Sequence, residues 1–561
     1  MTPTRHRRSA LLLTASLLLA SLLALGAPRA AYASTYAAYL PLDDSIYDEL
    51  DTLNNIGLLE SYVSEIKPIS RVEAARLVLE AQSIESESQT PNELAESIIS
   101  ALRAQLPEEI AWVEKDREDD LPSMIHPVER VTASYINSQG QRREIEGVSG
   151  GGLNFREGTP LLPYDNNLPT SSGSNEALLW DGWGGFGGFL TGYGEGSLAG
   201  PIGREPSYAS RAQLLIGAAV VSLGNTAISF GREQMSDGVG TIGGLSQSTN
   251  AAPFPALRVR NIHPGHLPFF FRYLGLVHYD VFIGQLDTER TFSSPWIAGQ
   301  AVGFRTLPWL DWGITHDIMF GGSGNNNYNA MGFLGRATGF DTGNPQGANT
   351  NSRFGMYAKF YVPQLRYTQF YGEILGEDYF QPFGNKLPLK TPFKGPSYDA
   401  GIYCPQVTKD ARTTFGIEWI LTDREYSTHN DSLYWTYDQA LMGNALGPGA
   451  WNFNVDAGRW VTTAAKLDLS LFYTYRVPPT FTQVSQIAGF ANKNETSWGF
   501  AFDFLHLPIE MTRFADTLGE VRARTGLEYV SDINYSTHDS LRALVQLSFG
   551  LTPSWPSFTW H

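Results

Sequence analysis

The feature that most constrains this chain is a regular alternation of apolar and polar residues in its second half. From Leu467 to Tyr475, Leu and Tyr residues fall on one face, and Asp468 and Ser470 fall on the other. Successive side chains of an extended strand point to opposite faces, so this pattern predicts strands with one apolar and one polar face. The same alternation recurs from Trp498 to Phe504 and from Leu541 to Phe549.

Charges on the polar face favour a barrel that spans a membrane. Asp468, Asp503 and Arg542 would be costly against lipid, so we expect them to line an aqueous interior. Tyr and Trp at many strand ends suit aromatic girdles better than the reverse arrangement, a soluble barrel or propeller with apolar residues inside. No apolar run beyond residue 33 reaches the roughly 18–20 residues of a membrane helix. The chain is therefore predicted to be mainly β, a large antiparallel transmembrane β-barrel of about 18 strands.

The first 33 residues have the pattern of a secretory signal peptide. Three arginines precede an apolar run from Ala10 to Leu25, and Ala31-Tyr32-Ala33 offers the small residues that signal peptidase recognises. We expect residues 1–33 to be removed on export. The formal net charge of −17 argues against nucleic acid as a partner, because phosphates need a basic surface. Cys404 is the single cysteine, so no intrachain disulfide is expected.

Residues 34–125 are predicted to form a small α-helical bundle ahead of the barrel, which takes residues 126–561. Apolar residues recur at helical spacing between Ser45 and Gly57. Ser70 and Thr90 each precede a Glu by three positions, the spacing of a capping box at a helix N-terminus. The bundle is too polar for lipid, so we expect it in the periplasm, as a plug or a docking domain.

The same N-terminal region supports an alternative. The segments YLPLDDSIYDELDTLNNIGLLESY and KPISRVEAARLVLEA resemble an S-layer homology repeat. The matching positions are Ile56, Gly57, Pro68, Ile69, Ser70, Arg71, Glu73, Ala74 and Ala75. Such a repeat implies binding to a cell-wall polymer. The alternative function is therefore a sugar-permeable outer-membrane porin tethered through its N-terminal module.

The stretch from Thr226 to Arg290 carries the first candidates for a site. Its alternation places Phe230 on the lipid face and Glu233 in the interior phase. Arg258 and Arg260 alternate with apolar neighbours and are expected to point into the lumen. We predict that Glu233 pairs with one of these arginines and braces or occludes the interior. Arg232 and Asn250 are predicted to belong to the rim of this network.

Several segments together resemble the Wzi family of capsule-assembly proteins. They are YLPLDDSIYDELDTLNNIGLL, SFGRE, STNAAPFPALRV, FIGQLDTER, VPQLRYTQFYGEILGED and LYWTYDQALMGNALGPG, in that order along the chain. The resemblance implies an outer-membrane barrel with a small N-terminal helical bundle. It also implies a non-catalytic, lectin-like protein that retains capsular or other extracellular polysaccharide at the cell surface. Outer-membrane lipid is a further partner, and the polysaccharide export machinery is another candidate.

Carbohydrate binding needs aromatic faces and planar polar side chains. The segment from Phe320 to Gly355 is rich in Asn and Gly and contains Tyr328, which makes it a candidate sugar-binding loop. Glu418 lies in GIEWI, and the related GLEYV recurs from Gly526; both patterns predict a strand with an inward Glu. We include Tyr328 and Glu418 among the candidate polysaccharide-binding or lumen residues.

Catalytic and metal chemistry are not indicated. His538, Asp539 and Ser540 are the residue types of a hydrolase triad, but neighbours along an extended chain point in opposite directions. His263 and His266 are more simply explained as loop residues than as metal ligands. We therefore predict no enzyme activity, no cofactor and no metal.

Overall fold

The computed structural model describes residues 35–115, 121–141, 144–145, 155–156, 161, 168, 172–202, 211–241, 243–288, 290–326, 349–380, 393–424, 426–427, 433–438, 440–478, 490–511, 517–553 and 558–560. The predicted signal peptide, Tyr328 and most of the candidate loop around it lie outside these residues. None of the helices in the described part of the chain has the length and apolarity to cross a membrane.

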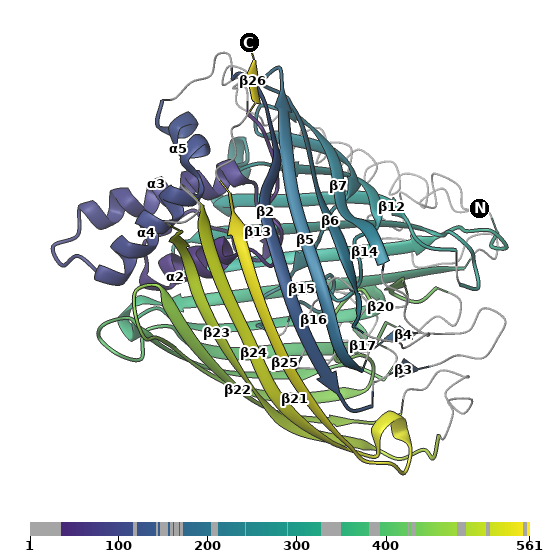
Figure 1. The fold of residues 1–561 in the computed structure, drawn as a ribbon. Coiled ribbons are helices and arrows are strands. Elements are labelled where there is room, and N and C mark those ends of the chain that lie inside the picture. Colours follow the sequence, from purple (N-terminus) through teal and green to yellow (C-terminus); the bar gives the residue numbers. More distant parts are fainter. Residues whose placement is uncertain are drawn as a thin grey trace.

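Eighteen strands of the described residues form one closed antiparallel barrel (Figure 1). In order around the wall they are β2 (Ser123–Gln139), β5 (Gly173–Phe186), β6 (Leu190–Pro201), β7 (Arg211–Leu223), β8 (Thr226–Arg232), β10 (Pro255–Asn261), β12 (Leu276–Gln285), β13 (Trp296–Leu307), β14 (Leu310–Phe320), β15 (Thr350–Val362), β16 (Thr368–Phe380), β17 (Phe393–Cys404), β18 (Thr413–Leu421), β21 (Ala450–Trp460), β22 (Ala465–Arg476), β23 (Glu495–Glu510), β24 (Leu518–Ser531) and β25 (Ser540–Thr552). β25 pairs with β2 and closes the barrel. The predicted fold class is confirmed, and β2 begins slightly before the predicted boundary at residue 126.

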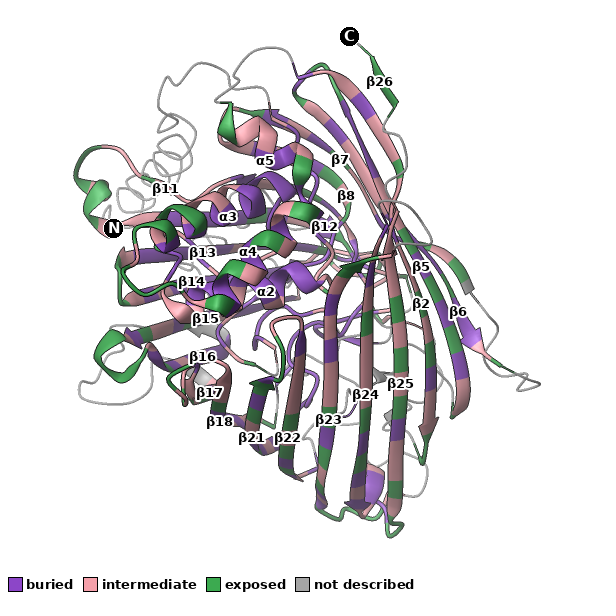
Figure 2. Cartoon of the chain, turned by 60° about the vertical axis from the view of Figure 1, so that its left-hand side comes forward, coloured by how far each residue is buried: buried purple, intermediate pink, exposed green. Residues whose placement is uncertain are grey.

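The two faces of the wall differ as the alternation predicts. On β22, Leu469, Leu471 and Tyr473 are exposed on the outer face, whereas Phe472 and Thr474 are buried on the inner face. Figure 2 shows exposed positions alternating with buried or half-buried ones along β23, β24 and β25. The outer surface is therefore apolar, and the polar side chains face the lumen.

The helical domain consists of α2 (Ser45–Ile56), α3 (Arg71–Ser86), α4 (Glu93–Gln105) and α5 (Pro107–Glu114). Its core is built from Leu and Ile side chains of all four helices. Ser70 caps α3 as predicted, since its Oγ accepts the Glu73 N–H at 3.2 Å. The predicted cap of α4 is wrong: Asn92, not Thr90, accepts the Leu94 N–H, at 3.0 Å, because the helix begins two residues later.

The two ends of the barrel have different connections. At one end, tight turns join pairs such as β5 and β6, β7 and β8, and β13 and β14; at the other end most connections are long. We call these the short-turn end and the long-connection end. The helical domain lies at the short-turn end (Figure 2). There Trp460 and Leu507, from the ends of β21 and β23, join the helical core, and Arg412 in the β17–β18 turn pairs with Glu93 at 2.9 Å.

Shorter elements complete the fold. They are β1 (Ile66–Lys67), β3 (Glu144–Ile145), β4 (Phe155–Arg156), β9 (Ser236–Asp237), β11 (Gly265–His266), β19 (Thr436–Tyr437), β20 (Ala440–Leu441) and β26 (Phe558–Trp560), with the 3-10 helices η1 (Phe269–Leu274), η3 (Pro363–Leu365) and η5 (Ile533–Tyr535). β1 and β9 matter most for the site, because they join the helical domain to a loop inside the barrel.

Candidate functional site

The connection between β8 and β10 folds into the lumen instead of projecting from the barrel. Its polar residues Gln234, Ser246 and Gln247 are buried. β9, within this connection, pairs with β1 of the helical domain, and the Gly238 N–H donates to the Glu65 carbonyl at 3.0 Å. This inward loop therefore crosses the lumen from the long-connection end and meets the helical domain.

The connection between β18 and β21 also fills the lumen. Trp435 is fully buried, and its indole N–H donates to Glu377 on the inner wall at 3.1 Å. The two inward connections pack together in one apolar cluster that includes Phe254 and Met442. Asn250 joins them, because its side-chain amide donates to the Leu441 carbonyl at 2.9 Å. Asn250 was predicted at the rim, but the structure places it in this buried joint.

A network of charges holds the inward loop to the wall. Arg258 and Arg260 are each only 1 % exposed and point into the lumen. Glu233 bonds to Arg260 and lies 3.8 Å from Arg258, so the predicted pairing is confirmed. Arg258 is also bound by Asp280 of β12 and donates to the Gln234 carbonyl at 2.9 Å.

The same network reaches the helical domain. The Arg260 guanidinium stacks on the ring of Tyr39, with its central carbon 3.3 Å from the ring centroid. Asp280 and Tyr39 were missed by the sequence reasoning. Asp280 could have been found from the sequence, because the alternation along β12 places it on the inward face together with Phe282. Tyr39 lies in irregular chain, where no alternation indicates which way its side chain points.

Of the remaining candidate residues, Glu418 and Arg232 lie on opposite faces of the barrel wall. Glu418 faces inward as predicted and accepts the Thr241 N–H at 2.9 Å and the Tyr371 hydroxyl at 3.0 Å, so it fastens the inward loop to β16 and β18. Arg232 is exposed at the end of β8, in the same outward phase as Phe230, and its predicted place at the rim of the network is wrong. Tyr328 lies outside the described residues.

Further ion pairs connect the helical domain to the inner wall. Asp43 pairs with Arg130 at 3.0 Å, and Glu65 pairs with Lys359 at 2.6 Å. Burial alone would raise the pKa of Glu65, but the charge of Lys359 and the hydrogen bond to it hold this pKa below its usual value. Glu65 is thus ionised while fully buried, which ties the helical domain to β15.

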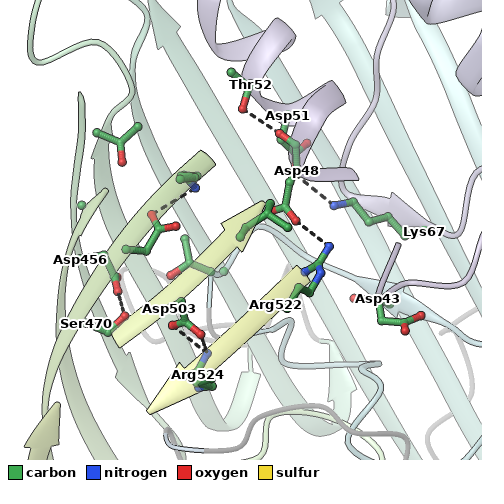
Figure 3. A pocket seen from close by; sticks show the side chains of 18 of the residues that line it. Asp43, Asp48, Asp51, Thr52, Lys67, Asp456, Ser470, Asp503, Arg522 and Arg524 are labelled. Carbon is green, nitrogen blue, oxygen red and sulfur yellow. Dashed lines mark hydrogen bonds and ion pairs between the residues drawn. The ribbon is translucent and has the colours of Figure 1, made fainter. Parts of the chain in front are cut away.

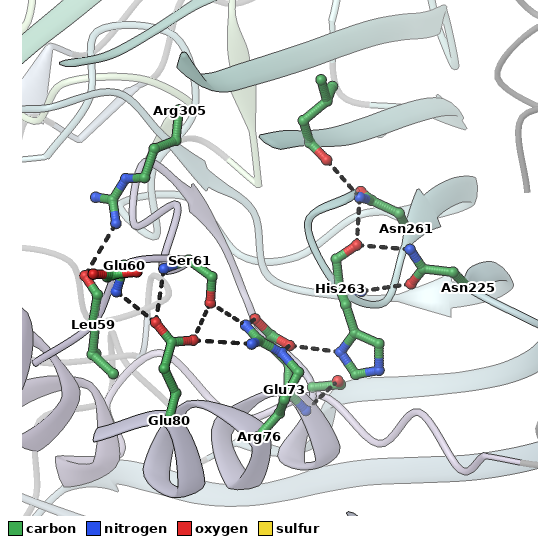
Figure 4. Close-up of polar contacts among 12 residues, drawn as sticks. Leu59, Glu60, Ser61, Glu73, Arg76, Glu80, Asn225, Asn261, His263 and Arg305 are labelled. Atoms are coloured by element: carbon green, nitrogen blue, oxygen red, sulfur yellow. Dashed lines mark hydrogen bonds and ion pairs between the residues drawn. The ribbon is translucent and has the colours of Figure 1, made fainter. Parts of the chain in front are cut away.

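The polar residues that resemble an S-layer homology repeat are used inside the molecule. Arg71 pairs with Glu109 at 2.5 Å and with Glu129 of β2 at 2.8 Å. Glu73 bonds to Arg76 and to His263 of the β10–β12 connection, the latter at 2.6 Å (Figure 4). These side chains are committed to packing the domain and docking it on the barrel.

Between the helical domain, the inward loop and the inner wall lies a cavity of about 780 Å³, lined by residues of β2, β5, β15 to β18 and β21 to β25. Asp48 of α2 pairs with Arg522 of the wall at 3.1 Å, and Arg524 pairs with Asp503 at 3.0 Å (Figure 3). Nine carboxylates and six cationic side chains line the cavity, together with hydroxyls and amides. It can hold water and neutral polar molecules, and its excess of carboxylates disfavours an acidic saccharide.

Two residues of the suspected hydrolase triad, Asp539 and Ser540, have other hydrogen-bond partners. No group of three or more His, Cys, Asp and Glu side chains within the described ranges has the arrangement of a metal site. Asp539 accepts the hydroxyl of Tyr529 at 2.6 Å, and the Ser540 hydroxyl accepts the Gln141 N–H at 3.0 Å. These contacts hold a surface turn together and do not form a relay.

Comparison with known proteins agrees with this architecture. The family model described as capsule assembly protein Wzi matches residues 152–504, more than half of the chain. No curated protein matches the chain in sequence. Among solved structures, Wzi, an outer membrane protein involved in group 1 capsule assembly in Escherichia coli and a carbohydrate-binding β-barrel, is 16 % identical, with a TM-score of 0.61 over 91 % of this chain and 99 % of that chain.

More distant barrels are also similar. OprD from Pseudomonas aeruginosa is 8 % identical, with a TM-score of 0.41 over 78 % of this chain and 95 % of that chain. OccK11 from Pseudomonas aeruginosa is 10 % identical, with a TM-score of 0.40 over 77 % and 95 %. The family match and the closed barrel with its apolar outer face lead to one conclusion: the chain is an outer-membrane β-barrel that belongs to the Wzi family of capsule assembly proteins.

Proposed function

We propose that the protein is a non-catalytic, lectin-like protein that retains capsular or other extracellular polysaccharide at the cell surface. The observation that carries this proposal is the filled lumen. Glu233, Arg258 and Arg260 fasten the inward loop across the interior, and the helical domain lies against the same loop. A barrel occupied in this way is suited to binding a polymer on its surface and poorly suited to passing one through.

Membrane barrels have short periplasmic turns and longer extracellular loops. We therefore assign the short-turn end and the helical domain to the periplasm, and the long connections to the cell exterior. Polysaccharide would be bound at the long-connection end. In this orientation the helical domain is the part of the chain that periplasmic export machinery could contact.

The second candidate is a sugar-permeable porin, and the cavity of about 780 Å³ is the observation in its favour. Two findings weigh against it. The inward connections pack against the inner faces of β10, β12, β13 and β14, and Arg71 and Glu73 of the supposed wall-binding repeat are engaged within the protein.

Two measurements, one of surface polysaccharide and one of channel conductance, distinguish polysaccharide retention from the porin alternative. Deletion of the gene should release polysaccharide from the cell surface into the medium, and a plasmid copy should restore retention. The purified full-length barrel in planar lipid bilayers should show no open-channel current. An open-channel current together with unchanged surface polysaccharide on deletion would overturn the proposal in favour of the porin.

A further inference from the structure

An unusual group of aromatic residues lies at the short-turn end, in the connection between β10 and β12. The helix η1 has the sequence FFFRYL, and Phe269, Phe270 and Tyr273 are 77 %, 68 % and 72 % exposed. The rings of Phe270 and Phe271 pack against each other in a tilted arrangement, with ring centroids 4.0 Å apart. Isolated exposed apolar residues need no explanation, but neighbouring ones within a single turn indicate a surface that meets something apolar.

The end of η1, at Leu274, lies beside β13 of the barrel wall. On β13, Arg305 points inward, because it binds the Leu59 carbonyl of the helical domain and Asp311. Phe304 is adjacent to Arg305 and so points outward, yet it is only 8 % exposed, whereas the outward-facing Leu307 is 39 % exposed. Something therefore covers Phe304 on the outer face.

Trp312 of β14 is part of this cover, and further contacts join the end of η1 to the same place on the wall. The Thr306 hydroxyl donates to the Leu274 carbonyl at 2.7 Å, and the Trp312 indole N–H donates to the same hydroxyl at 2.8 Å. Trp312 also stacks on Phe304, with ring centroids 4.3 Å apart. One side of the connection is thus fixed to the outer wall, and the rings of Phe269, Phe270 and Tyr273 face away from the protein.

The exposed rings continue the apolar outer surface of the barrel. Leu223 in β7, Leu307 in β13 and Trp309 in the β13–β14 turn are exposed at the same end of the barrel. Arg272 adds a cation among the rings: its guanidinium lies 5.1 Å from the Tyr273 ring centroid and donates to the Tyr273 hydroxyl at 3.2 Å. Aromatic rings with a neighbouring cation are the composition of surfaces that lie at the boundary between acyl chains and anionic headgroups.

We propose that η1 is an interfacial anchor that binds phospholipid of the membrane leaflet at the short-turn end. Phe269, Phe270 and Tyr273 enter the boundary between headgroups and acyl chains, and Arg272 binds a phosphate. A periplasmic protein is the other occupant that exposed rings could serve. Continuity with the outer wall of a membrane barrel favours lipid.

The test places a fluorescent probe in the helix of the full-length protein. In a Cys404→Ser background, Phe270→Cys is labelled with an environment-sensitive nitrobenzoxadiazole dye and transferred to nanodiscs of phosphatidylethanolamine and phosphatidylglycerol. Lys409→Cys, in the exposed β17–β18 turn at the same barrel end, is the matched control. Heat-modifiable migration on gels confirms that each barrel is folded.

We expect blue-shifted emission at position 270, severalfold stronger quenching by brominated phospholipids than at position 409, and weak quenching by aqueous iodide. Adding Arg272→Gln should weaken the preference of the helix for phosphatidylglycerol, seen as a smaller difference between nanodiscs with and without that lipid. The proposal is overturned if position 270 is as accessible to iodide as position 409. That result would leave the rings in water, free for a periplasmic protein.

Discussion

Arg260 shows how much one side chain can contribute to a filled lumen. It is buried, bonds to Glu233 and stacks on Tyr39 of the helical domain. Arg260→Met leaves Glu233 without its closest cation, and breaking a buried pair in this way typically costs about 3–5 kcal/mol. We expect a clear fall in the melting temperature of the purified protein, measured by scanning calorimetry.

The matched control is Arg412→Gln, which breaks the pair between Arg412 and Glu93. The Glu93 side chain is 82 % exposed, and exposed pairs contribute only about 0–1 kcal/mol. This variant should melt close to the wild type. Equal losses in Arg260→Met and Arg412→Gln would contradict the role given to the buried network.

Glu65 gives a prediction about pH. Its pKa in the folded protein is held below the usual value by Lys359, so the stability that it contributes is present above the usual carboxylate pKa and is lost as pH falls through the lowered value. Glu65→Gln removes the charge. The melting temperature of Glu65→Gln should therefore lie below that of the wild type at pH 7, and the gap should narrow as pH falls below the usual carboxylate range.

Glu93→Gln, at an exposed position, is the control for this measurement. Its melting temperature at neutral pH should differ from that of the wild type by no more than the loss of one surface ion pair would cause. A gap for Glu65→Gln that stays constant between neutral and strongly acidic pH would show that the loss comes from packing and not from the charge.

At the scale of elements, the short β1–β9 pairing is the joint between the helical domain and the inward loop. Lys67 and Ser236 are directly opposed in this antiparallel pair. Opposed residues have Cα atoms about 4.5–5.5 Å apart, a separation that a disulfide can bridge. In a Cys404→Ser background, Lys67→Cys with Ser236→Cys should cross-link on mild oxidation, as a shift in gel mobility.

Lys67→Cys with Lys409→Cys, which places the second thiol in the β17–β18 turn, should remain reduced under the same conditions. Failure of the first pair to cross-link while the barrel is folded would mean that the loop does not reach the helical domain.

The sequence predicted those elements in which apolar and polar residues alternate with a regular period. The period of two identified the wall, its inner face and therefore the directions of Glu233, Arg258, Arg260 and Glu418. It could not predict how irregular chain fills the interior. Asn250 and Asp237 lie in a connection without a period, and their partners, Leu441 and Ile66, are far away along the chain. Arg232 was misplaced because it directly precedes Glu233 but points to the opposite face.

For the whole molecule, the filling of the lumen decides between a closed barrel and a channel. Barrels of about 16–18 strands are wide enough for an aqueous channel when their interior is empty. Here the inward loop, the β18–β21 connection and the helical domain occupy much of that space, and a cavity of about 780 Å³ remains between them. Replacing residues 235–247 with a short Gly-Ser linker removes β9 and the segment that Glu418 holds.

This loop variant should conduct ions in planar lipid bilayers, with a current severalfold above the wild-type baseline, because the remaining cavity would join the space that the loop vacates. The helical domain still covers the short-turn end through the pairs of Asp43 with Arg130 and Asp48 with Arg522, so the current should stay below that of an empty barrel. Heat-modifiable migration confirms folding, and Arg412→Gln again serves as the control. A folded loop variant with no current would show that the helical domain alone seals the barrel.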